Sequence, residues 1–371
     1  MPAGIPRSTP HDDERGERII QVLTMEQQVR TAELAQRFGV SEMTIRRDLA
    51  SLEAQQRLRR IHGGAIAPGS RAAAPPLSIG MVVPSAEYYF PKILQGAREA
   101  CASRGARLVS ASSDRSASEQ LRQIADLIDR GVDGLIVTPV THVPRDSSTF
   151  AALRDSPVPV TLIERVIEDG DDHKNLDIVR SEHAQGAAIA LAHLVDMGHR
   201  SVALMHRNSP TASRLRQGYL RGLDRHGLAE HTYIASLSVE LSPQEAHERI
   251  RAIADELLNR GFTAAIVLPD ADAILLQAVL GERGIDVPRR FSIIAYDDES
   301  AAYARMPLTS IAPAKAEIGR LAANGCLDRI IAQRRGVTLP IKHTTVLPLL
   351  QIRKSTGRRT SSEGALRPDG S

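Results

Sequence analysis

Residues that can bind phosphates and base edges gather in one short stretch near the N-terminus. The run SEMTIRRDL carries two adjacent arginines, Arg46 and Arg47, and three more arginines follow by residue 60. A guanidinium group donates hydrogen bonds in a planar fork, which suits phosphate oxygens and the guanine edge in the major groove. Against Asp48 and Glu53, these five arginines leave residues 46–60 with a charge of +3, as large as the net charge of the whole chain. The stretch therefore indicates a surface for nucleic acid.

Two short helices and a hairpin are expected to position these arginines. Apolar residues at helical spacing predict a helix over 32–38, which Gly39 ends. Ser41 is a natural N-cap for a second helix, with Ile45, Leu49 and Leu52 on its apolar face. Residues 57–61 and 65–67 predict two short strands around the tip 62–64. This is the pattern of a winged helix-turn-helix. Its expected DNA contacts are Ser41, Met43, Thr44, Arg46, Arg47, Arg59, Arg60, His62 and Gly63.

The alternative for this stretch is a small helical bundle with a solvated arginine face. The turn, the cap, the arginine pair and the hairpin all agree on the helix-turn-helix, so we favour it. A first helix over 14–23 completes a DNA-binding domain that we place at 12–67. Residues 1–11 contain three prolines and no periodicity, which predicts a disordered arm, and the Pro-containing segment 68–76 predicts an extended linker.

The composition is that of an ordinary globular protein. The chain has 371 residues, 42% of them hydrophobic and 25% charged, but only 3% aromatic, so the core must be aliphatic. Cys101 and Cys326 lie in apolar helical patterns without the spacing of a metal site, and we expect buried thiols. No apolar run reaches the length of a membrane span and no secretion signal is evident, so we expect a cytoplasmic protein without a membrane partner.

From Leu77 onward, short apolar strands alternate with helices of ten to fifteen residues. This alternation requires βαβ units, and the length of 77–352 predicts two doubly wound α/β lobes with ligands at the carboxyl ends of the strands. We expect lobe 1 at 77–180 and 311–335 and lobe 2 at 181–308 and 340–352. The chain should cross between them near 180–181, 308–310 and 336–340, and the basic tail 353–371 should be disordered.

The N-terminal pattern resembles the DNA-binding domain of the DeoR family of bacterial regulators. That family's signature is ELA-x-x-F-x-VS-x-x-TIRRDL, followed by R-x-HGGA. This chain matches it at residues 33–35, 38, 40–41, 44–49 and 60–65. The resemblance implies a winged helix that binds operator DNA.

The second region, 77–353, resembles the effector-binding domain of the lactose-repressor (LacI) family, which is similar to periplasmic sugar-binding proteins. The resemblance rests on RGVDGLIV, on GAAIALAHLVDMGHRSVALM and on VPRRFSIIAYDDESAAYARMPLTSI, among others. It implies a small-molecule effector between the lobes, a sugar or sugar derivative, and a homodimer. The hinge helix usual in that family has no counterpart in APGSRAAAPP, so the signal should reach DNA by a different route.

Sugar hydroxyls both donate and accept hydrogen bonds, so a sugar site needs carboxylates, guanidinium groups and often an aromatic face. Asp297 matches the first aspartate of the family's YDD element, which binds sugar there. An aspartate after a strand is otherwise an N-cap of the next helix, and this alternative stays open for Asp114, Asp270 and Asp297. The expected effector-binding residues follow the strands: Tyr88, Tyr89, Phe90, Asp114, Glu164, Arg165, Arg214, Arg216, Asp270 and Asp297.

Three positions depart from the LacI pattern. Pro269 stands where the family often has Asn, and an aromatic that stacks on sugar in some members is replaced near Leu241. The register of the family's ligand arginine falls on Leu215, so either Arg214 or Arg216 could take its role. The identity of the sugar therefore does not carry over.

Two further patterns have simpler explanations. His183, His193, His199 and His206 lack the spacing of a metal site, so we expect core or solvated histidines and no metal. Residues 209–213, SPTAS, could hold a phosphate at a helix start, but a simple N-cap is the more frequent role.

The sequence thus predicts a DNA-binding transcription regulator, in the first instance a repressor, that responds to a sugar. The alternatives are an enzyme that acts on sugars or nucleotides with the same fold, and a transport binding protein. The chain has no GxGxxG, no Walker lysine loop and no G-x-S-x-G, so we expect neither a cofactor nor an enzyme. The operator, the effector and the direction of regulation stay open.

Overall fold

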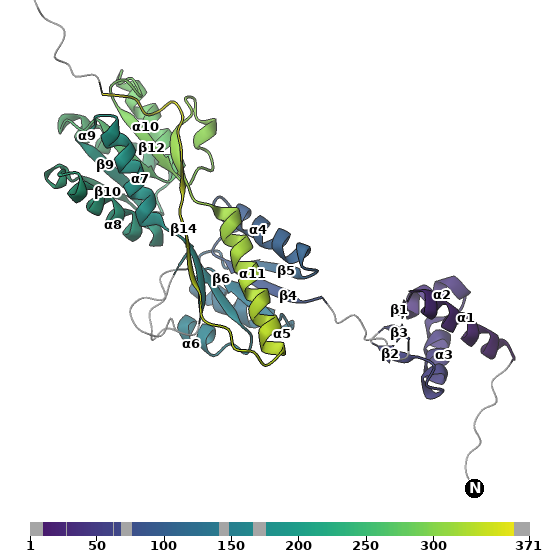
Figure 1. Cartoon of the computed structure of the whole chain (residues 1–371). Coiled ribbons are helices and arrows are strands. Elements are labelled where there is room, and N and C mark those ends of the chain that lie inside the picture. Colours follow the sequence, from purple (N-terminus) through teal and green to yellow (C-terminus); the bar gives the residue numbers. More distant parts are fainter. Residues whose placement is uncertain are drawn as a thin grey trace, which may run out of the picture. The chain divides into compact units, whose positions relative to one another are not determined.

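The computed structural model describes residues 10–26, 28–61, 63–67, 76–140, 148–165 and 176–359. The chain divides into two compact units between Pro76 and Leu77 (Figure 1). Most of the expected linker, residues 68–75, lies outside the described residues, as do residues 1–9 of the expected arm. Within the described ranges, no helix combines the length and the apolar character needed to cross a membrane.

The N-terminal unit is a winged helix-turn-helix. Its elements are α1 (Pro10–Glu26), β1 (Gln28–Arg30), α2 (Thr31–Phe38), α3 (Glu42–Ala54), β2 (Arg59–Ile61) and β3 (Gly64–Ile66). The three strands form an antiparallel sheet in the order β1-β3-β2. Aliphatic side chains from all three helices fill the core, among them Ile19, Leu34, Ile45 and Leu49.

Local signals fix the turn between α2 and α3. Gly39 has φ +65°, the left-handed conformation that glycine adopts without strain, and ends α2. Ser41 then caps α3, since its side-chain oxygen accepts a hydrogen bond from Thr44 N–H. One of our expectations is wrong in this unit, because helix α1 already begins at Pro10, inside the expected arm. Strand β1 was not predicted.

Lobe 1 of the second unit is a sheet of six strands in the order β14-β8-β7-β6-β4-β5. The strands are β4 (Ser78–Val83), β5 (Arg107–Ser112), β6 (Gly134–Val137), β7 (Val160–Ile163), β8 (Asp177–Ser181) and β14 (His343–Val346), all parallel. Helices α4 (Phe90–Ser103) and α11 (Lys315–Arg334) share one core cluster with the sheet. Helices α5 (Ala117–Asp129) and α6 (Ser148–Arg154) form the other, so both faces of the sheet are covered.

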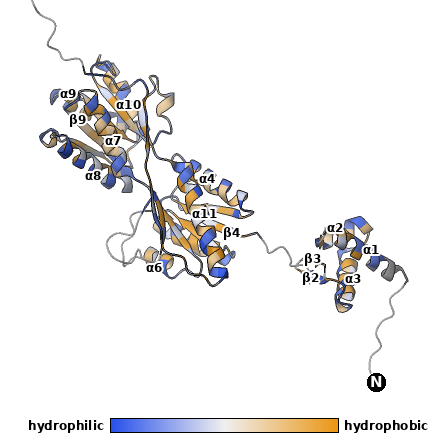
Figure 2. Ribbon diagram, in the orientation of Figure 1, coloured by the Kyte–Doolittle hydropathy of each residue, from blue (hydrophilic) through white to orange (hydrophobic). Residues whose placement is uncertain are grey.

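Lobe 2 repeats this architecture in the strand order β10-β9-β11-β12-β13-β15. The strands are β9 (Val202–Arg207), β10 (Ile234–Leu237), β11 (Ala264–Leu268), β12 (Ser292–Tyr296), β13 (Thr309–Ala312) and the antiparallel β15 (Leu349–Gln351). Helices α9 (Pro243–Asn259) and α10 (Asp270–Glu282) share one core cluster, and α7 (His183–Asp196) and α8 (Pro210–Arg225) share the other. Two 3-10 turns, η2 (Ala229–His231) and η3 (Ala301–Tyr303), lie in the connections. The strands are mainly apolar and the outer helix faces mainly polar (Figure 2).

The doubly wound α/β prediction is confirmed, but two of the three crossings were placed wrongly. Strand β13 stays in lobe 2, so the second crossing falls between Ala312 and Lys315 rather than at 308–310. Strand β14 pairs with β8 in lobe 1, so the third crossing falls at 347–348 rather than at 336–340. Strand membership depends on pairing with distant residues, which a local pattern does not contain.

The expected disordered tail is ordered over its first seven residues. Arg353 pairs with Asp298, and the buried Ser355 bonds to both Thr309 and Ile293. Residues 353–359 are therefore part of lobe 2, because their polar side chains satisfy backbone groups at the end of its sheet. Residues 360–371 lie outside the described residues.

Candidate functional site

The first turn of α3 is open to solvent. Met43 is 65% exposed, the side chain of Arg46 is 61% exposed, and Arg47 is exposed too. Arg46 Nη2 lies 3.1 Å from the Glu42 carboxylate one turn earlier. Such an exposed pair contributes only about 0.3–0.5 kcal/mol, so it yields readily to a phosphate or a base edge. Ser41 and Thr44, at the start of the turn, bond to each other through the cap.

The wing carries two exposed arginines, Arg59 and Arg60. Arg60 is held by Glu53, which accepts from both its backbone N–H and its Nε at 2.8 Å. The hydrogen bond from Arg60 N–H lowers the pKa of Glu53, although burial opposes this. Gly63 has φ +75°, and its carbonyl oxygen accepts from Thr31 N–H, which ties the wing to α2. His62 lies outside the described residues.

A buried ion pair orients α3. Arg15 on α1 donates to both oxygens of Asp48, at 2.6 and 3.0 Å, and Asp48 is buried. Two-pronged pairing fixes an arginine and a carboxylate more tightly than a single contact does. The adjacent Arg46 and Arg47, the cations of α3, are both exposed to solvent.

The second unit has a cavity of about 480 Å³ that both lobes line. Its walls come from the carboxyl ends of the strands, as expected for doubly wound sheets. Lobe 1 contributes Tyr88, Tyr89, Phe90, Arg115, Glu164 and Arg165, and lobe 2 contributes His183, Arg207, Asn208, Ser209, Thr211 and Asp297, among others.

Backbone strain gathers around this cavity. Among the described residues, seven that are not glycine have positive φ, and six of them follow strands at the carboxyl edges of the two sheets: Tyr88, Asp114, Arg115, Glu164, Asp297 and Asp298. Non-glycine residues rarely adopt this conformation, and where they do the strain tends to mark functional sites. The strain therefore points to the cavity independently of its lining.

Glu164 is the best-organised polar group of the cavity. Its carboxylate accepts from Tyr89 Oη at 2.9 Å and from the N–H and Oγ of Ser181 at 3.0 and 2.9 Å. His183 Nε2 lies 3.5 Å away. Burial raises the pKa of Glu164, but the hydrogen bonds and the His183 charge together bring it below its usual value. The carboxylate is thus held ready to accept a further hydroxyl.

Asp297 faces the same cavity from lobe 2 and is buried. Burial raises the pKa of this carboxyl well above its usual range, and the nearby Lys315 ammonium opposes the rise. Tyr88, which lines the same cavity, accepts a hydrogen bond on its Oη from Asp270 N–H at 3.3 Å. Burial, together with these carboxylates, raises the pKa of the Tyr88 hydroxyl.

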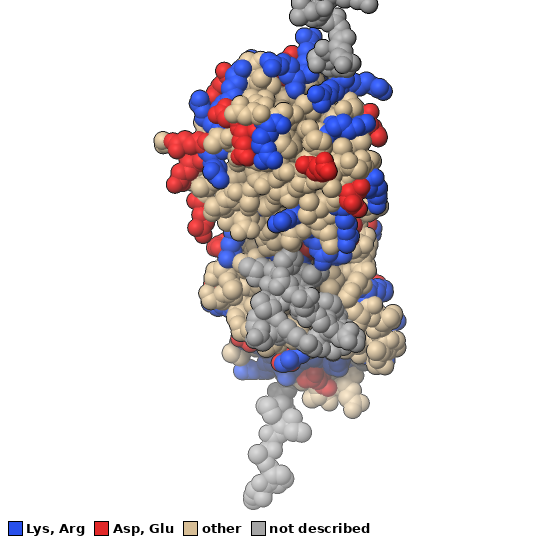
Figure 3. Space-filling model, turned by 90° about the vertical axis from the view of Figure 1, so that its left-hand side faces the viewer, with Lys and Arg blue, Asp and Glu red and all other residues tan. Residues whose placement is uncertain are grey.

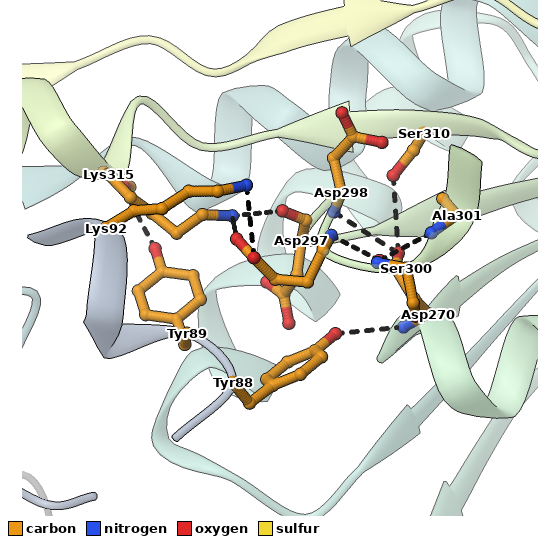
Figure 4. Close-up of polar contacts among 12 residues, drawn as sticks. Tyr88, Tyr89, Lys92, Asp270, Asp297, Asp298, Ser300, Ala301, Ser310 and Lys315 are labelled. Atoms are coloured by element: carbon orange, nitrogen blue, oxygen red, sulfur yellow. Dashed lines mark hydrogen bonds and ion pairs between the residues drawn. The ribbon is translucent and has the colours of Figure 1, made fainter. Parts of the chain in front are cut away.

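The fully buried Asp270 holds a loop instead of facing the cavity. Its Oδ2 accepts from the N–H groups of Glu299, Ser300 and Ala301 at 2.6, 2.8 and 3.2 Å, and its Oδ1 from Asp298 N–H at 3.3 Å (Figure 4). Burial raises its pKa, and these four hydrogen bonds work against the rise. Asp270 is not among the lining residues, so the structure assigns it the positioning of the loop after Asp297.

Three other expected effector residues lie apart from the main cavity. Asp114 is exposed and bonds to Ser112, and Arg216 is exposed on α8. Arg214 lies in a small neighbouring pocket with Arg180 and Thr211. The structure therefore brings together Tyr88, Tyr89, Phe90, Glu164, Arg165 and Asp297, but not these three.

Arg165, an expected residue, is held by the backbone of lobe 1. Its Nη1 donates to the carbonyl oxygens of Pro139 and Val140, and burial lowers its pKa to about 10.

Other lining residues were not identified from the sequence. Arg207 was missed, and it forms a two-pronged pair with the buried Asp272 at 2.8 and 2.9 Å. His183 was considered only as part of a histidine cluster. Its place at the start of α7, just after the crossing from lobe 1, was the signal that could have identified it.

Charge does not single out a further site on the face shown in Figure 3. On the face shown in Figure 3, basic and acidic side chains are interspersed over wide neutral areas. No group of three or more potential metal ligands occurs among the described residues. Within that part of the chain, His193, His199 and His206 each have a hydrogen-bond partner and a pKa that burial lowers.

One family model matches within each of the two units of the chain. Residues 15–71 match the DeoR-like helix-turn-helix domain, and residues 191–356 match the periplasmic binding protein-like domain. Both resemblances drawn from the sequence are thereby confirmed.

Similar proteins cover most of the chain. The arabinose metabolism transcriptional repressor of Geobacillus stearothermophilus is 28% identical over 335 residues, which are 87% of this chain and 90% of that protein. The HTH-type transcriptional repressor PurR of Haemophilus influenzae is 28% identical over 285 residues, or 75% of this chain and 81% of that protein. A LacI family regulator from Enterococcus faecium, solved with bound ribose, superposes with a TM-score of 0.61 at 25% identity, over 76% of this chain and 100% of that one.

Proposed function

We propose that this chain, a transcriptional regulator that joins a DeoR-like helix-turn-helix domain to a LacI-type sensor domain, is a repressor whose operator affinity is set by a sugar bound between the two lobes. The observation that carries the proposal is the cavity of about 480 Å³, to whose lining each lobe contributes one buried carboxyl group, Glu164 and Asp297. The volume lies in the usual range for small-molecule sites.

The chemistry of the cavity suits a polyhydroxylated ligand. A buried carboxylate accepts hydrogen bonds from hydroxyl groups, and it discriminates against analogues that lack them. Tyr88, Tyr89 and Phe90 add aromatic surface on the lobe 1 side, which suits the apolar face of a sugar ring. The name of the Geobacillus relative and the ribose in the Enterococcus structure support this ligand class.

On the DNA side, we assign the exposed turn of α3 to the major groove. Met43, Arg46 and Arg47 would contact base edges or phosphates, and Arg59 would contact the backbone from the wing. Arg60 is held by Glu53, so its first role would be to fix the wing. A single helix-turn-helix makes few base contacts, so we also propose a homodimer that reads two half-sites.

The test is a footprint of the full chain on its own upstream DNA, repeated with a panel that includes arabinose and ribose. A protected site with repeated half-sites, whose protection one sugar weakens or strengthens, is the expected result. The competing function is an enzyme on the same fold, and turnover of a panel sugar without any specific footprint would favour it. Sedimentation of a monomer that binds the operator as a monomer would remove the homodimer.

A further inference from the structure

Lys315 is a lysine in an unusual place. It is only 3% exposed and is the first residue of α11, directly after the chain crosses from β13 in lobe 2 into lobe 1. Burying an ammonium group is costly unless anions or oxygen acceptors surround it. A buried ammonium group at this position therefore needs nearby anions or oxygen acceptors, and groups from both lobes surround it.

Three groups surround the Lys315 ammonium (Figure 4). Nζ donates to the backbone oxygen of Asp297, lies 2.6 Å from Glu299 Oε1, and stands 5.0 Å from the centre of the Tyr89 ring. Asp297 and Glu299 belong to lobe 2, whereas Tyr89 belongs to lobe 1. One ammonium thus contacts a cavity residue on each wall.

A second lysine shares the same carboxylate. Lys92 on α4 lies 3.2 Å from Glu299 Oε2, so the two oxygens of one lobe 2 carboxylate each face an ammonium from lobe 1. Lys92 is half exposed and Glu299 is mostly buried. The pair therefore lies at the edge of the contact between the lobes, with Lys315 behind it.

Both ends of this contact are rigid. Glu299 lies in the loop whose backbone N–H groups Asp270 holds with four hydrogen bonds. Helices α4 and α11 pack so closely that a Cβ on Gly96 would lie 1.9 Å from the carbonyl oxygen of Ala316. The backbone at each end is therefore held within its own lobe, so a change of lobe position acts directly on the two ion pairs.

We propose that Lys315, Lys92 and Glu299 form an ionic latch between the lobes, and that Lys315 is the positioning residue that links the latch to Asp297 and Tyr89 in the cavity. The latch stabilises the lobe arrangement of this structure. A ligand that contacts Asp297 then binds a carboxyl group whose backbone is held by the latch, so the affinity of that ligand depends on lobe position. Only this effect on ligand affinity rests on the proposed function, because the latch itself needs neither DNA nor sugar.

The test measures the distance between the lobes in the full chain without ligand. Spin labels at Arg122→Cys in lobe 1 and Arg289→Cys in lobe 2 use side chains that are 64% and 86% exposed. Both native cysteines are buried, which keeps them from being labelled. Diluting labelled with unlabelled protein restricts the electron–electron distance measurement to pairs within one chain.

Lys92→Met should raise the population outside the main distance by about 2- to 5-fold, as expected for an exposed ion pair. Glu299→Gln removes the ion pairs with both lysines and should raise this population further. Because Lys92 then has no carboxylate partner left to lose, the double variant Lys92→Met/Glu299→Gln should have the same distance distribution as Glu299→Gln alone. Lys315→Arg should resemble the unchanged protein more closely than Lys315→Met does. If Lys315→Met fails to fold, the isosteric Glu299→Gln still decides the question.

The matched control is Arg98→Met, which removes a second exposed cation from α4. Arg98 is exposed and makes no ion pair with the residues that the structure describes. The spin-label distance distribution of Arg98→Met should therefore stay as in the unchanged protein. An unchanged distribution in Glu299→Gln, or an equal change in Arg98→Met, would overturn the latch. Failure of any sugar to bind would count against the proposed function and would leave this result as it stands.

Discussion

Asp270→Asn should destabilise the sensor unit through the loop at 298–301, whatever the ligand. The native carboxylate accepts three N–H groups on Oδ2 and one on Oδ1. An asparagine amide has one oxygen. If that oxygen takes the place of Oδ2, the hydrogen bonds from Glu299, Ser300 and Ala301 remain, but to a neutral acceptor. The amide NH₂ then faces Asp298 N–H, and this hydrogen bond is lost because both groups are donors.

The magnitude follows from this count. A hydrogen bond to a charged group contributes about 1.5–3 kcal/mol, against about 1 kcal/mol for a neutral pair. Losing one such bond costs at least about 1.5 kcal/mol, and each of the three that remain weakens by at least about 0.5 kcal/mol, so Asp270→Asn should lower the free energy of unfolding by about 3 kcal/mol or more. Asp270→Ala, which leaves all four N–H groups without this acceptor, should cost more.

The assay is urea unfolding followed by far-UV circular dichroism, since the chain has no tryptophan. A lower midpoint at an unchanged m-value is the expected result. Asp114→Asn is the matched control, because Asp114 is exposed and bonds only locally to Ser112. A loss below about 0.5 kcal/mol, combined with lost binding of arabinose or ribose, would refute the reasoning and make Asp270 a direct ligand.

Three further predictions concern other parts of the chain. Arg46→Ala or Arg47→Ala should weaken operator binding, measured by fluorescence anisotropy titration, by about 1–3 kcal/mol if the arginine contacts a base edge. An equal loss of affinity for random DNA would mean that the arginine contacts only phosphates. Burial lowers the pKa of His199, so the neutral imidazole stabilises the fold fully above about pH 6.5, and this stabilisation is lost as the pH falls through the lowered pKa. In His199→Gln, the melting temperature should therefore depend less on pH between about pH 7 and 5.5 than in the unchanged protein. A chain ending at residue 352 should lose about 3 kcal/mol of stability in urea unfolding, because Arg353 and Ser355 no longer hold lobe 2, whereas a chain ending at 359 should not.

The helix-turn-helix could be predicted because its signals are local. Gly39, Ser41 and the apolar face of α3 lie within about four turns of helix, and each acts on its own neighbours. Strand β1 could not be predicted in the same way. Its three residues alternate polar, apolar and polar, but three residues are too few to distinguish a strand from a loop. They form a strand because β3, more than thirty residues later, offers them a free edge.

The sensor fold was predictable from its alternation, but the division between the lobes was not. Whether β13 and β14 belong to one sheet or the other depends on pairing with β12 and β8, far away in the sequence. The same limit affected the site. Strand ends correctly suggested Glu164 and Asp297 as cavity residues, yet the role of Asp270 depends on a loop 28 to 31 residues later.

The two carboxylates of the cavity differ in how they could report a ligand. Glu164 takes its closest hydrogen bonds from Tyr89 and Ser181, which belong to its own lobe, whereas His183 of lobe 2 lies 3.5 Å away. A ligand that met Glu164 alone would bind almost equally well whatever the position of lobe 2, and so would shift no equilibrium. The surroundings of Asp297, in contrast, are built by both lobes through Tyr88 and Lys315. If the proposed sugar contacts Asp297, that contact is therefore the one that would couple sugar binding to a change of lobe position.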